Sequence, residues 1–214
     1  SYVVAKTKFS NQAGVISDFV DAFIPSNQVS INYMVYLPEY VSLKIENKFG
    51  DIYIDDYNGR LDLSLSNGDL KANRLSGSPR IMLSSTDAVI NHISNGKIYL
   101  SYSDLEIRES TGLYLDTKSS RVNLGKGSRI DIDSKRDKFE IGSVRELTVD
   151  GYFSSVNAGN LDRELRCTLK YGDITIADIE DAFSLISIES EYTDIDLFFQ
   201  RNTSYNLDIV HHNE

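Results

Sequence analysis

The chain has 214 residues, of which 41% are apolar and 10% aromatic, and it carries a formal net charge of −10. A chain of this length holds one large domain or two small ones, and this composition is typical of a globular protein with a hydrophobic core. The acidic balance argues against nucleic acid or an anionic membrane as a partner, because both require a basic surface. Calcium, cationic partners and neutral glycans stay open as ligands.

Cysteine content and hydropathy exclude further classes. The single cysteine, Cys167, cannot form an intrachain disulfide or a cysteine-based zinc cluster. No apolar run approaches the ~20 residues that a membrane-spanning helix needs, so we expect no transmembrane segment. No secretory leader is recognisable, and a start at Ser1 instead of Met suggests a processed or engineered N-terminus. The missing leader therefore does not decide the localisation.

The first 40 residues follow no repeat. Residues 1–9 are typical of a short strand, and the alternation over residues 29–37 predicts a second strand that ends at Pro38. Between them, helical spacing of apolar residues over 15–24 predicts a short amphipathic helix, although a flexible hairpin loop fits the same residues. We expect residues 1–40 to form an N-terminal cap.

From residue 41 onward a short pattern recurs with a nearly constant period. The stretch from Asn47 to Ile54 (NKFGDIYI) has close relatives around Asp69 and Asp173, and the steps between successive Asp positions are 17 or 18 residues, with a last step of 21. We call these positions the Asp column. It consists of Asp51, Asp69, Asp87, Asp104, Arg121, Lys138, Ser155, Asp173 and Asp194.

Three further columns keep an apolar character in this register. Every residue one position after the Asp column is apolar, and so is every residue two positions further, as Ile52 and Ile54 illustrate. Six positions before the Asp column the residues are also apolar as far as Cys167, and we expect Leu185 to continue this column in the longer last repeat. Apolar positions two apart indicate strands rather than helices.

This repeat predicts an all-β protein, a single-stranded parallel β-helix or β-solenoid. A unit of this size buries its apolar face only by stacking on its neighbours. We therefore expect one domain with about nine rungs of 16–18 residues over residues 41–200, on the order of 43 Å long at ~4.8 Å per rung. Paired alternating strands favour a right-handed coil. A C-terminal strand within 201–214 would cover the last rung.

The stretch from Asn47 to Ile54, with the related stretches around Phe139 and Tyr171 and the preceding strand from Ser30 to Pro38, resembles an adhesin family of bacterial β-solenoid domains (domain of unknown function 4097). The resemblance covers about residues 29–200. It implies a secreted or cell-envelope protein of Bacteroidetes-type bacteria, periplasmic or anchored to the outer membrane as a lipoprotein, with adhesion as its role. The family has no catalytic motif to carry over, and its members tend to have a further rung before this chain starts.

The acidic part of the Asp column is a candidate calcium site. Carboxylates stacked at one turn edge repel one another unless cations or backbone donors compensate, and oxygen ligands suit a hard cation. Against this, Asp favours turns because it accepts bonds from local backbone N–H groups, and Arg121 and Lys138 continue the column with opposite charge. We favour turn chemistry. The candidate metal ligands are Asp51, Asp69, Asp87 and Asp104.

A second candidate site lies two residues before the Asp column, where aromatic side chains are frequent. Because this position is at a turn, part of each ring should be exposed, and aromatic faces on a rigid β surface can stack on sugars or on partner side chains. The alternative is a ladder in which each ring covers the adjacent rung. The candidate ligand-binding residues are Phe49, Tyr102, Phe153, Tyr171 and Tyr192.

No pattern in the sequence indicates nucleophilic catalysis. His92 falls in an expected turn without a Ser-His-Asp set, and Cys167, in an apolar column, is expected to be a buried space-filling residue. Polysaccharide lyases and hydrolases built on parallel β-helices use clustered carboxylates with a nearby cation, and Asp104, Arg121 and Lys138 are the nearest approach to that arrangement.

We therefore predict a non-enzymatic, adhesin-like β-solenoid of the cell envelope or the extracellular space. It would present a rigid surface to a glycan or to a cell-envelope protein, without a cofactor. Two alternatives stay open, a carbohydrate-active enzyme on a parallel β-helix and a purely structural or assembly module.

Overall fold

The computed structural model describes residues 32–38, 41–201, 204–206 and 208, and within them the chain consists of strands and connecting turns without a helix. The ten strands are β1 (Leu43–Asn47), β2 (Ile52–Tyr57), β3 (Leu61–Leu75), β4 (Arg80–Ile93), β5 (Gly96–Ser101), β6 (Asp104–Lys118), β7 (Arg121–Lys135), β8 (Lys138–Tyr152), β9 (Ser155–Ile179) and β10 (Leu185–Phe199). The described part of the chain contains no candidate for a membrane-spanning helix.

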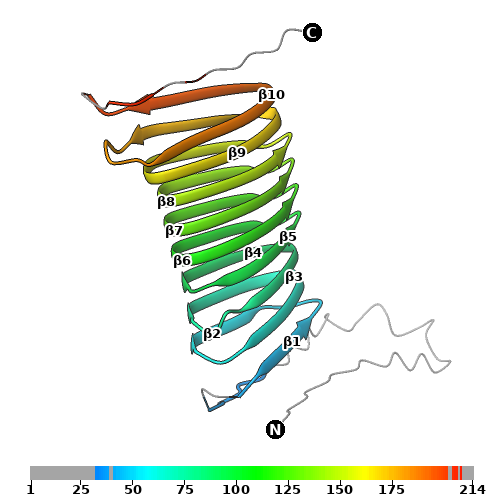
Figure 1. Cartoon of the computed structure of the whole chain (residues 1–214). Helices are drawn as coiled ribbons and strands as arrows, with labels where there is room; N and C mark the ends of the chain where they lie inside the picture. Colours follow the sequence, from blue (N-terminus) through cyan, green and yellow to red (C-terminus); the bar gives the residue numbers. More distant parts are fainter. Residues whose placement is uncertain (1–31, 39–40, 202–203, 207, 209–214) are drawn as a thin grey trace, which may run out of the picture.

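The strands stack as the rungs of a parallel β-solenoid, which confirms the predicted fold. All pairings between the described strands are parallel, in the order β1-β3-β4-β5-β6-β7-β8-β9-β10, with β2 pairing β3 and β4 also pairing β6. Figure 1 shows these flat turns stacked into a column from β1 to β10. Most strands are long because the pairing continues around a bend in each rung. We call the bend a corner and the two straight segments on either side of it the arms of the rung.

The register is that of the Asp column. Asp69 pairs with Asp87, Asp104 with Arg121, and Asp173 with Asp194. Parallel strands in this register place equivalent residues of successive rungs ~4.8 Å apart. A side chain is therefore surrounded mainly by its counterparts one rung above and one rung below.

The core lies between the two arms of the rungs. In β7, Val122 and Leu124 point inward from the first arm and Ile130 and Ile132 from the second, and all four are at most 2% exposed. The same columns are buried from β3 to β9. Apolar burial stabilises a protein by about 25 cal/mol per Å², and a single rung could not exclude water from either of its arms.

The expected place of Leu185 is wrong. Ile188 pairs with Cys167 and continues the apolar column, whereas Leu185 pairs with Glu164. The residues between β9 and β10 leave the ladder in a turn at 181–182, so that the extra length of the last repeat lies before Leu185. A count from the Asp column cannot show where in a repeat an insertion lies.

The expected strands at the two ends are also wrong where the structure describes them. Residues 32–38 form no strand, and Met34 and Tyr36 are 81% and 86% exposed. Residues 204–206 and 208 form none either, and Tyr205 instead stacks on Phe199 with ring centroids 4.6 Å apart. An alternating sequence forms a stable strand only when its backbone finds a partner, and no described segment pairs with these residues. The strand expected at 1–9 and the helix expected at 15–24 lie outside the described residues.

Candidate functional site

One corner of the solenoid is formed by residues in the left-handed backbone conformation. We call it the corner column, and its first member is Phe49, where the neighbouring Gly50 takes the positive φ of 104°. At the other members, φ lies between 49° and 63°. They are Asn67, Ser85, Tyr102, Ser119, Arg136, Phe153, Tyr171 and Tyr192. This conformation crowds Cβ and is uncommon for residues other than glycine, so its recurrence shows that the reversal of the chain at this corner dominates the local preference.

A ladder of buried polar side chains runs directly behind the corner column. The hydroxyl oxygen of Ser103 accepts a hydrogen bond from the N–H of Thr86 at 3.1 Å, and that of Ser120 accepts from the N–H of Ser103 at 3.2 Å. Asp137 and Ser154 continue this ladder one and two rungs further on. These bonds satisfy backbone N–H groups that the corner removes from the strand pairing, and they fix the position of each corner residue.

Asp137 is the one charged residue among the buried side chains of the described chain, with 5% of its surface exposed. Its Oδ1 accepts from the N–H of Ser120 at 2.6 Å, and its Oδ2 accepts from the hydroxyls of Thr117 and Ser134 at 2.7 and 2.8 Å. The N–H of Lys135 donates to the same Oδ2 at 2.7 Å. Four donors compensate for the loss of hydration, so this carboxylate belongs to the framework of the corner.

Three of the five predicted aromatic site residues come together on β9, β10 and the turn before β9. The rings of Phe153 and Tyr171 stack with centroids 5.0 Å apart, and those of Tyr171 and Tyr192 with centroids 5.1 Å apart. Tyr152 contacts Phe153 and Tyr171 edge-on, at 4.5 and 5.7 Å. We call Tyr152, Phe153, Tyr171 and Tyr192 the aromatic stack. The four side chains are between 37% and 72% exposed.

The other two predicted aromatic residues lie apart from this stack. Phe49 is 77% exposed and Tyr102 is 62% exposed, and neither ring contacts another ring within the described part of the chain. Three rungs, ~14 Å, separate Tyr102 from Phe153. Ser119 and Arg136 occupy the corner positions between them.

Cationic side chains lie next to the aromatic stack on the same corner. Arg136 precedes Phe153 in the corner column, and Arg121 and Lys138 are paired neighbours in the Asp column. Arg121 forms an ion pair with Asp104 at 3.2 Å, and Lys138 forms one with Glu140 at 3.0 Å, where the hydrogen bond from Lys138 lowers the pKa of the Glu140 carboxyl.

Arg136 differs from its cationic neighbours. Its side chain is exposed, and no hydrogen bond or ion pair to another described side chain holds its guanidinium group. Lys170, beside the stack, is engaged instead, because it pairs with Glu191 and its pKa is raised mainly by that hydrogen bond. The Arg136 guanidinium is therefore free to bind a ligand at this corner.

A groove of about 490 Å³ runs along the corner over the rungs between Asp104 and Asp173. Arg136 and Lys138 line it together with Phe153 and Tyr171. Serine residues supply much of the remaining lining. They are Ser119, Ser120, Ser154 and Ser155. Arg121 and three carboxylates, Asp104, Asp137 and Asp173, complete the charged lining, so the groove combines cations, carboxylates, aromatic rings and hydroxyl groups.

Two of the four acidic residues in the Asp column are engaged, Asp51 by a backbone N–H of the next rung and Asp104 by an ion pair. The N–H of Asp69 donates to Oδ1 of Asp51 at 3.0 Å, and Asp104 faces Arg121, while Asp87 lies in register between Asp69 and Asp104. Over the described residues, no three His, Cys, Asp or Glu side chains lie close enough together to hold a metal ion. The proposed calcium ligands therefore do not converge.

A contact between His92 and Ser94 was not foreseen from the sequence. The Nε2 of His92 lies 3.1 Å from the hydroxyl of Ser94, and its Nδ1 lies 3.9 Å from Oε2 of Glu109, which is one rung away. The second distance is too long for the hydrogen bond that orients the histidine of a catalytic triad. Cys167 is buried, and burial raises the pKa of its thiol to about 12, with a smaller effect of Asp150, so it is a poor nucleophile.

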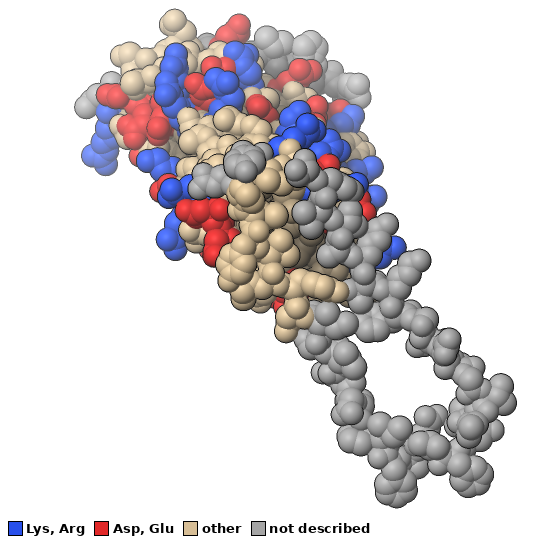
Figure 2. Space-filling view, turned by 90° about the horizontal axis from the view of Figure 1, so that it is seen from below, with Lys and Arg blue, Asp and Glu red and all other residues tan. Residues whose placement is uncertain are grey.

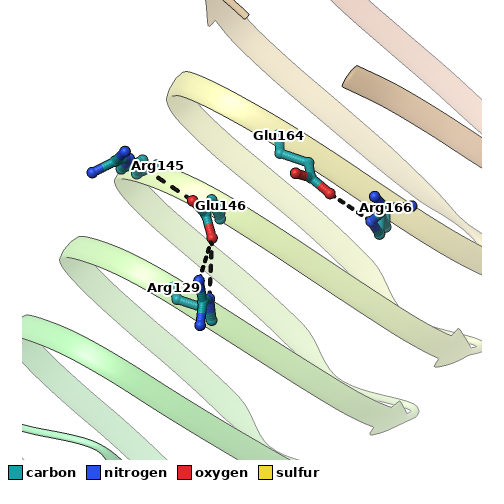
Figure 3. Close-up of polar contacts among 5 residues, drawn as sticks. All are labelled: Arg129, Arg145, Glu146, Glu164 and Arg166. Carbon is teal, nitrogen blue, oxygen red and sulfur yellow. Dashed lines mark hydrogen bonds and ion pairs between the residues drawn. The ribbon is translucent and has the colours of Figure 1, made fainter. Parts of the chain in front are cut away.

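At another turn of the rungs, opposite charges neutralise one another. Arg129 donates from Nε and Nη2 to Oε2 of Glu146, both at 3.0 Å, and Arg166 binds Glu164 at 2.5 Å (Figure 3). Arg145 approaches Glu146 from the other side, at 3.9 Å. Seen from below the first rung, acidic and basic side chains are likewise interspersed (Figure 2). Several other cationic side chains, among them Arg74, Arg108 and Lys126, also form no ion pair with a described residue, so what distinguishes Arg136 is its place in the lining of the groove.

No family model matches the chain, and neither the search of curated proteins nor that of solved structures found a match. The resemblance to the bacterial adhesin family stays a prediction. A binding role is therefore inferred from the fold and the corner described above.

Sequence reasoning missed two parts of this corner, the ring of Tyr152 and the free guanidinium of Arg136. Tyr152 could have been found from the period, because it directly precedes Phe153 of the corner column and occupies the same position in its rung as Lys135 and Lys170 in theirs. The position of Arg136 was visible from the period, but its lack of a partner was not. Ion pairing depends on which side chains of neighbouring rungs reach one another, and a one-dimensional register does not contain that information.

Proposed function

We propose that this chain is a non-enzymatic β-solenoid of the cell envelope or the extracellular space that presents a rigid surface to a glycan or a protein, in the manner of an adhesin. The observation that carries the proposal is the exposed aromatic stack. Clusters of large apolar side chains that stay in contact with water are uncommon on proteins without partners and are typical of interaction sites. Tyrosine is favoured there because its ring is apolar and its hydroxyl forms hydrogen bonds.

The rigidity of the corner supports this proposal. Strand pairing holds the chain on both sides of each corner residue, and the buried polar ladder holds the turn itself. Side chains ordered before binding lose little conformational entropy when a ligand arrives. A surface of this kind favours recognition, whereas a reaction would need convergent acid and base groups. The assignment to the cell envelope rests on the resemblance of the repeat to the adhesin family.

A binding experiment with two matched triple variants tests the proposal. The first, Phe153→Ala/Tyr171→Ala/Tyr192→Ala, removes the stacked rings, and the second, Phe49→Ala/Tyr53→Ala/Tyr102→Ala, removes three exposed rings elsewhere. We expect the unmodified chain and the second variant to bind the same glycans on an array, or the same envelope proteins in a pull-down. The first variant should lose this binding while its circular dichroism spectrum stays that of a folded β protein.

Two results would contradict the proposal. One is the absence of binding by the unmodified chain to either a broad glycan array or envelope material. The other is the release of reducing ends or unsaturated sugars from a panel of polysaccharides, which would assign an enzymatic activity.

A further inference from the structure

We propose that the ligand of this corner is an acidic glycan, a polysaccharide with carboxylate groups, bound along the groove from Arg121 to Tyr171. This inference rests on the function proposed above and specifies the class of ligand. It departs from the neutral or cationic partners that the net charge of −10 favours.

The geometry of the rings argues against a neutral sugar stacked on an aromatic face. Tyr171 has one face against Phe153 and the other against Tyr192, with interplanar angles of 18° and 2°. Both faces of the central ring are thus covered. Tyr192 has an outer face without a ring partner among the described residues, but it does not line the groove; of the two rings that do, Tyr171 has both faces covered and Phe153 has one, which leaves chiefly ring edges and the Tyr171 hydroxyl for a ligand there.

Ring edges and tyrosine hydroxyls favour an anion. The edge of an aromatic ring carries partial positive charge, and a phenolic O–H donates a hydrogen bond to a carboxylate. Arg136 adds a planar guanidinium whose donors match both oxygens of a carboxylate, and it stands one rung from Phe153. Cation, donors and ring edges therefore lie on one side of the ligand path.

The local charge supports the same conclusion. The groove is lined by three cations, Arg121, Arg136 and Lys138, and by three Asp, of which Asp104 is paired with Arg121 and Asp173 accepts a hydrogen bond from the hydroxyl of Ser155 at 2.7 Å. One of the three, Asp137, is buried and bound by four donors. Charges separated by more than ~10 Å are largely screened at 0.1 M salt, so Arg136, the groove cation without an ion pair to a described residue, governs binding at this corner more than the net charge does.

The shape of the groove favours a glycan over an acidic protein. The groove is open, extends along the stacked rungs, and is lined by serine residues and charged groups. Protein partners usually anchor a large side chain in a buried apolar pocket, which this lining does not provide. A linear polymer rich in hydroxyl groups can instead meet equivalent positions on successive rungs.

The test uses a pair of probes with the same sugar backbone, an oligogalacturonate and the same oligosaccharide with its carboxylates converted to uncharged methyl esters. Affinity for the full chain is measured by isothermal titration calorimetry at 50 and 300 mM NaCl. The site variant is Arg136→Ala/Lys138→Ala. The control Lys126→Ala/Arg145→Ala removes the same number of positive charges from positions outside the groove lining.

We expect the acidic probe to bind at least about tenfold more tightly than its ester, as loss of charge-assisted hydrogen bonds implies. The site variant should weaken that binding by about tenfold or more, the control by less than about twofold, and higher salt should weaken it further. Equal binding of ester and acid would overturn this inference but leave the proposed function intact. The same holds if the chain binds an acidic peptide but neither of the two oligosaccharides. Binding of the acid that is equally strong in the site variant would overturn the location. Failure to bind any glycan or protein would remove the proposed function itself.

Discussion

Tyr171 and Tyr192 lie in the same position of successive rungs, and their rings are nearly parallel, with 2° between the planes and 5.1 Å between the centroids. Both residues have left-handed φ values, 55° and 49°, so each Cβ leaves the corner in a similar direction. The separation of the rings is close to the spacing of the rungs themselves. The stack thus follows from the repeat, and its stability and its binding properties can be tested separately.

The central ring should contribute most to the stability of the corner. Replacing Tyr171 with Ala removes contacts with Phe153, Tyr192 and Tyr152, and we expect a loss of about 1–2 kcal/mol in the free energy of unfolding measured with urea. Tyr102→Ala is the control, because its φ of 53° is almost that of Tyr171 and its ring has no aromatic partner among the described residues. Equal losses in the two variants would show that the stacking adds no stability.

Relief of the left-handed conformation should stabilise the chain. At Ser119, where φ is 51°, glycine removes the crowding of Cβ, worth about 1–2 kcal/mol, and increases the entropy of the unfolded chain by about 0.5–1 kcal/mol. We expect Ser119→Gly to raise the free energy of unfolding by about 0.5 kcal/mol. Ser143→Gly, at a strand position without a positive φ, should lower it by about 0.5–1 kcal/mol. A lower stability of Ser119→Gly would argue against strain at this corner.

The buried carboxylate of Asp137 should be essential to the polar ladder. In Asp137→Asn one acceptor oxygen is replaced by an NH₂ group, which is a donor. This donor would face groups that now donate to Asp137, either the N–H of Ser120 or the hydroxyl of Thr117 and the N–H of Lys135. We expect a loss of about 1–3 kcal/mol in the free energy of unfolding, because a buried donor stays unsatisfied. Asp150→Asn, on an exposed side chain, should change it by less than about 0.5 kcal/mol. If Asp137→Asn is as stable as this control, the four hydrogen bonds are not needed.

Cys167 should be protected from alkylation in the folded chain. Burial raises the pKa of its thiol from 9.0 to about 12, and the thiolate is the reactive form. At pH 8 we expect iodoacetamide to modify Cys167 in urea but hardly at all in native buffer. Labelling in native buffer at the rate of the unfolded chain would show that the column around Cys167 is open.

The same pKa has a consequence for stability at high pH. Because the folded pKa lies above the unfolded value, the contribution of this thiol is fully present below about pH 9 and is lost as the pH rises from about 9 towards 12. The difference in unfolding free energy between the unmodified chain and Cys167→Ala, measured across this range, isolates the contribution from other titrating groups. A difference that does not change with pH would contradict the assignment.

The sequence alone determined the period, the columns of buried residues and the parallel stacking. Each rung buries the same positions, so these positions must be apolar in every repeat. Ile52 and its counterparts are therefore visible without coordinates. The period also places Phe49, Tyr102 and Tyr171 at a turn, but it does not determine which of their rings are in contact.

The tertiary structure decided the remaining points. It put Ile188 rather than Leu185 in the apolar column, since the extra residues of the last repeat leave the ladder before β10. It also joined Phe153 to Tyr171 and left the guanidinium of Arg136 without an ion pair to any described residue. These outcomes depend on side chains of neighbouring rungs competing for contacts in three dimensions, whereas the period records only which positions are equivalent.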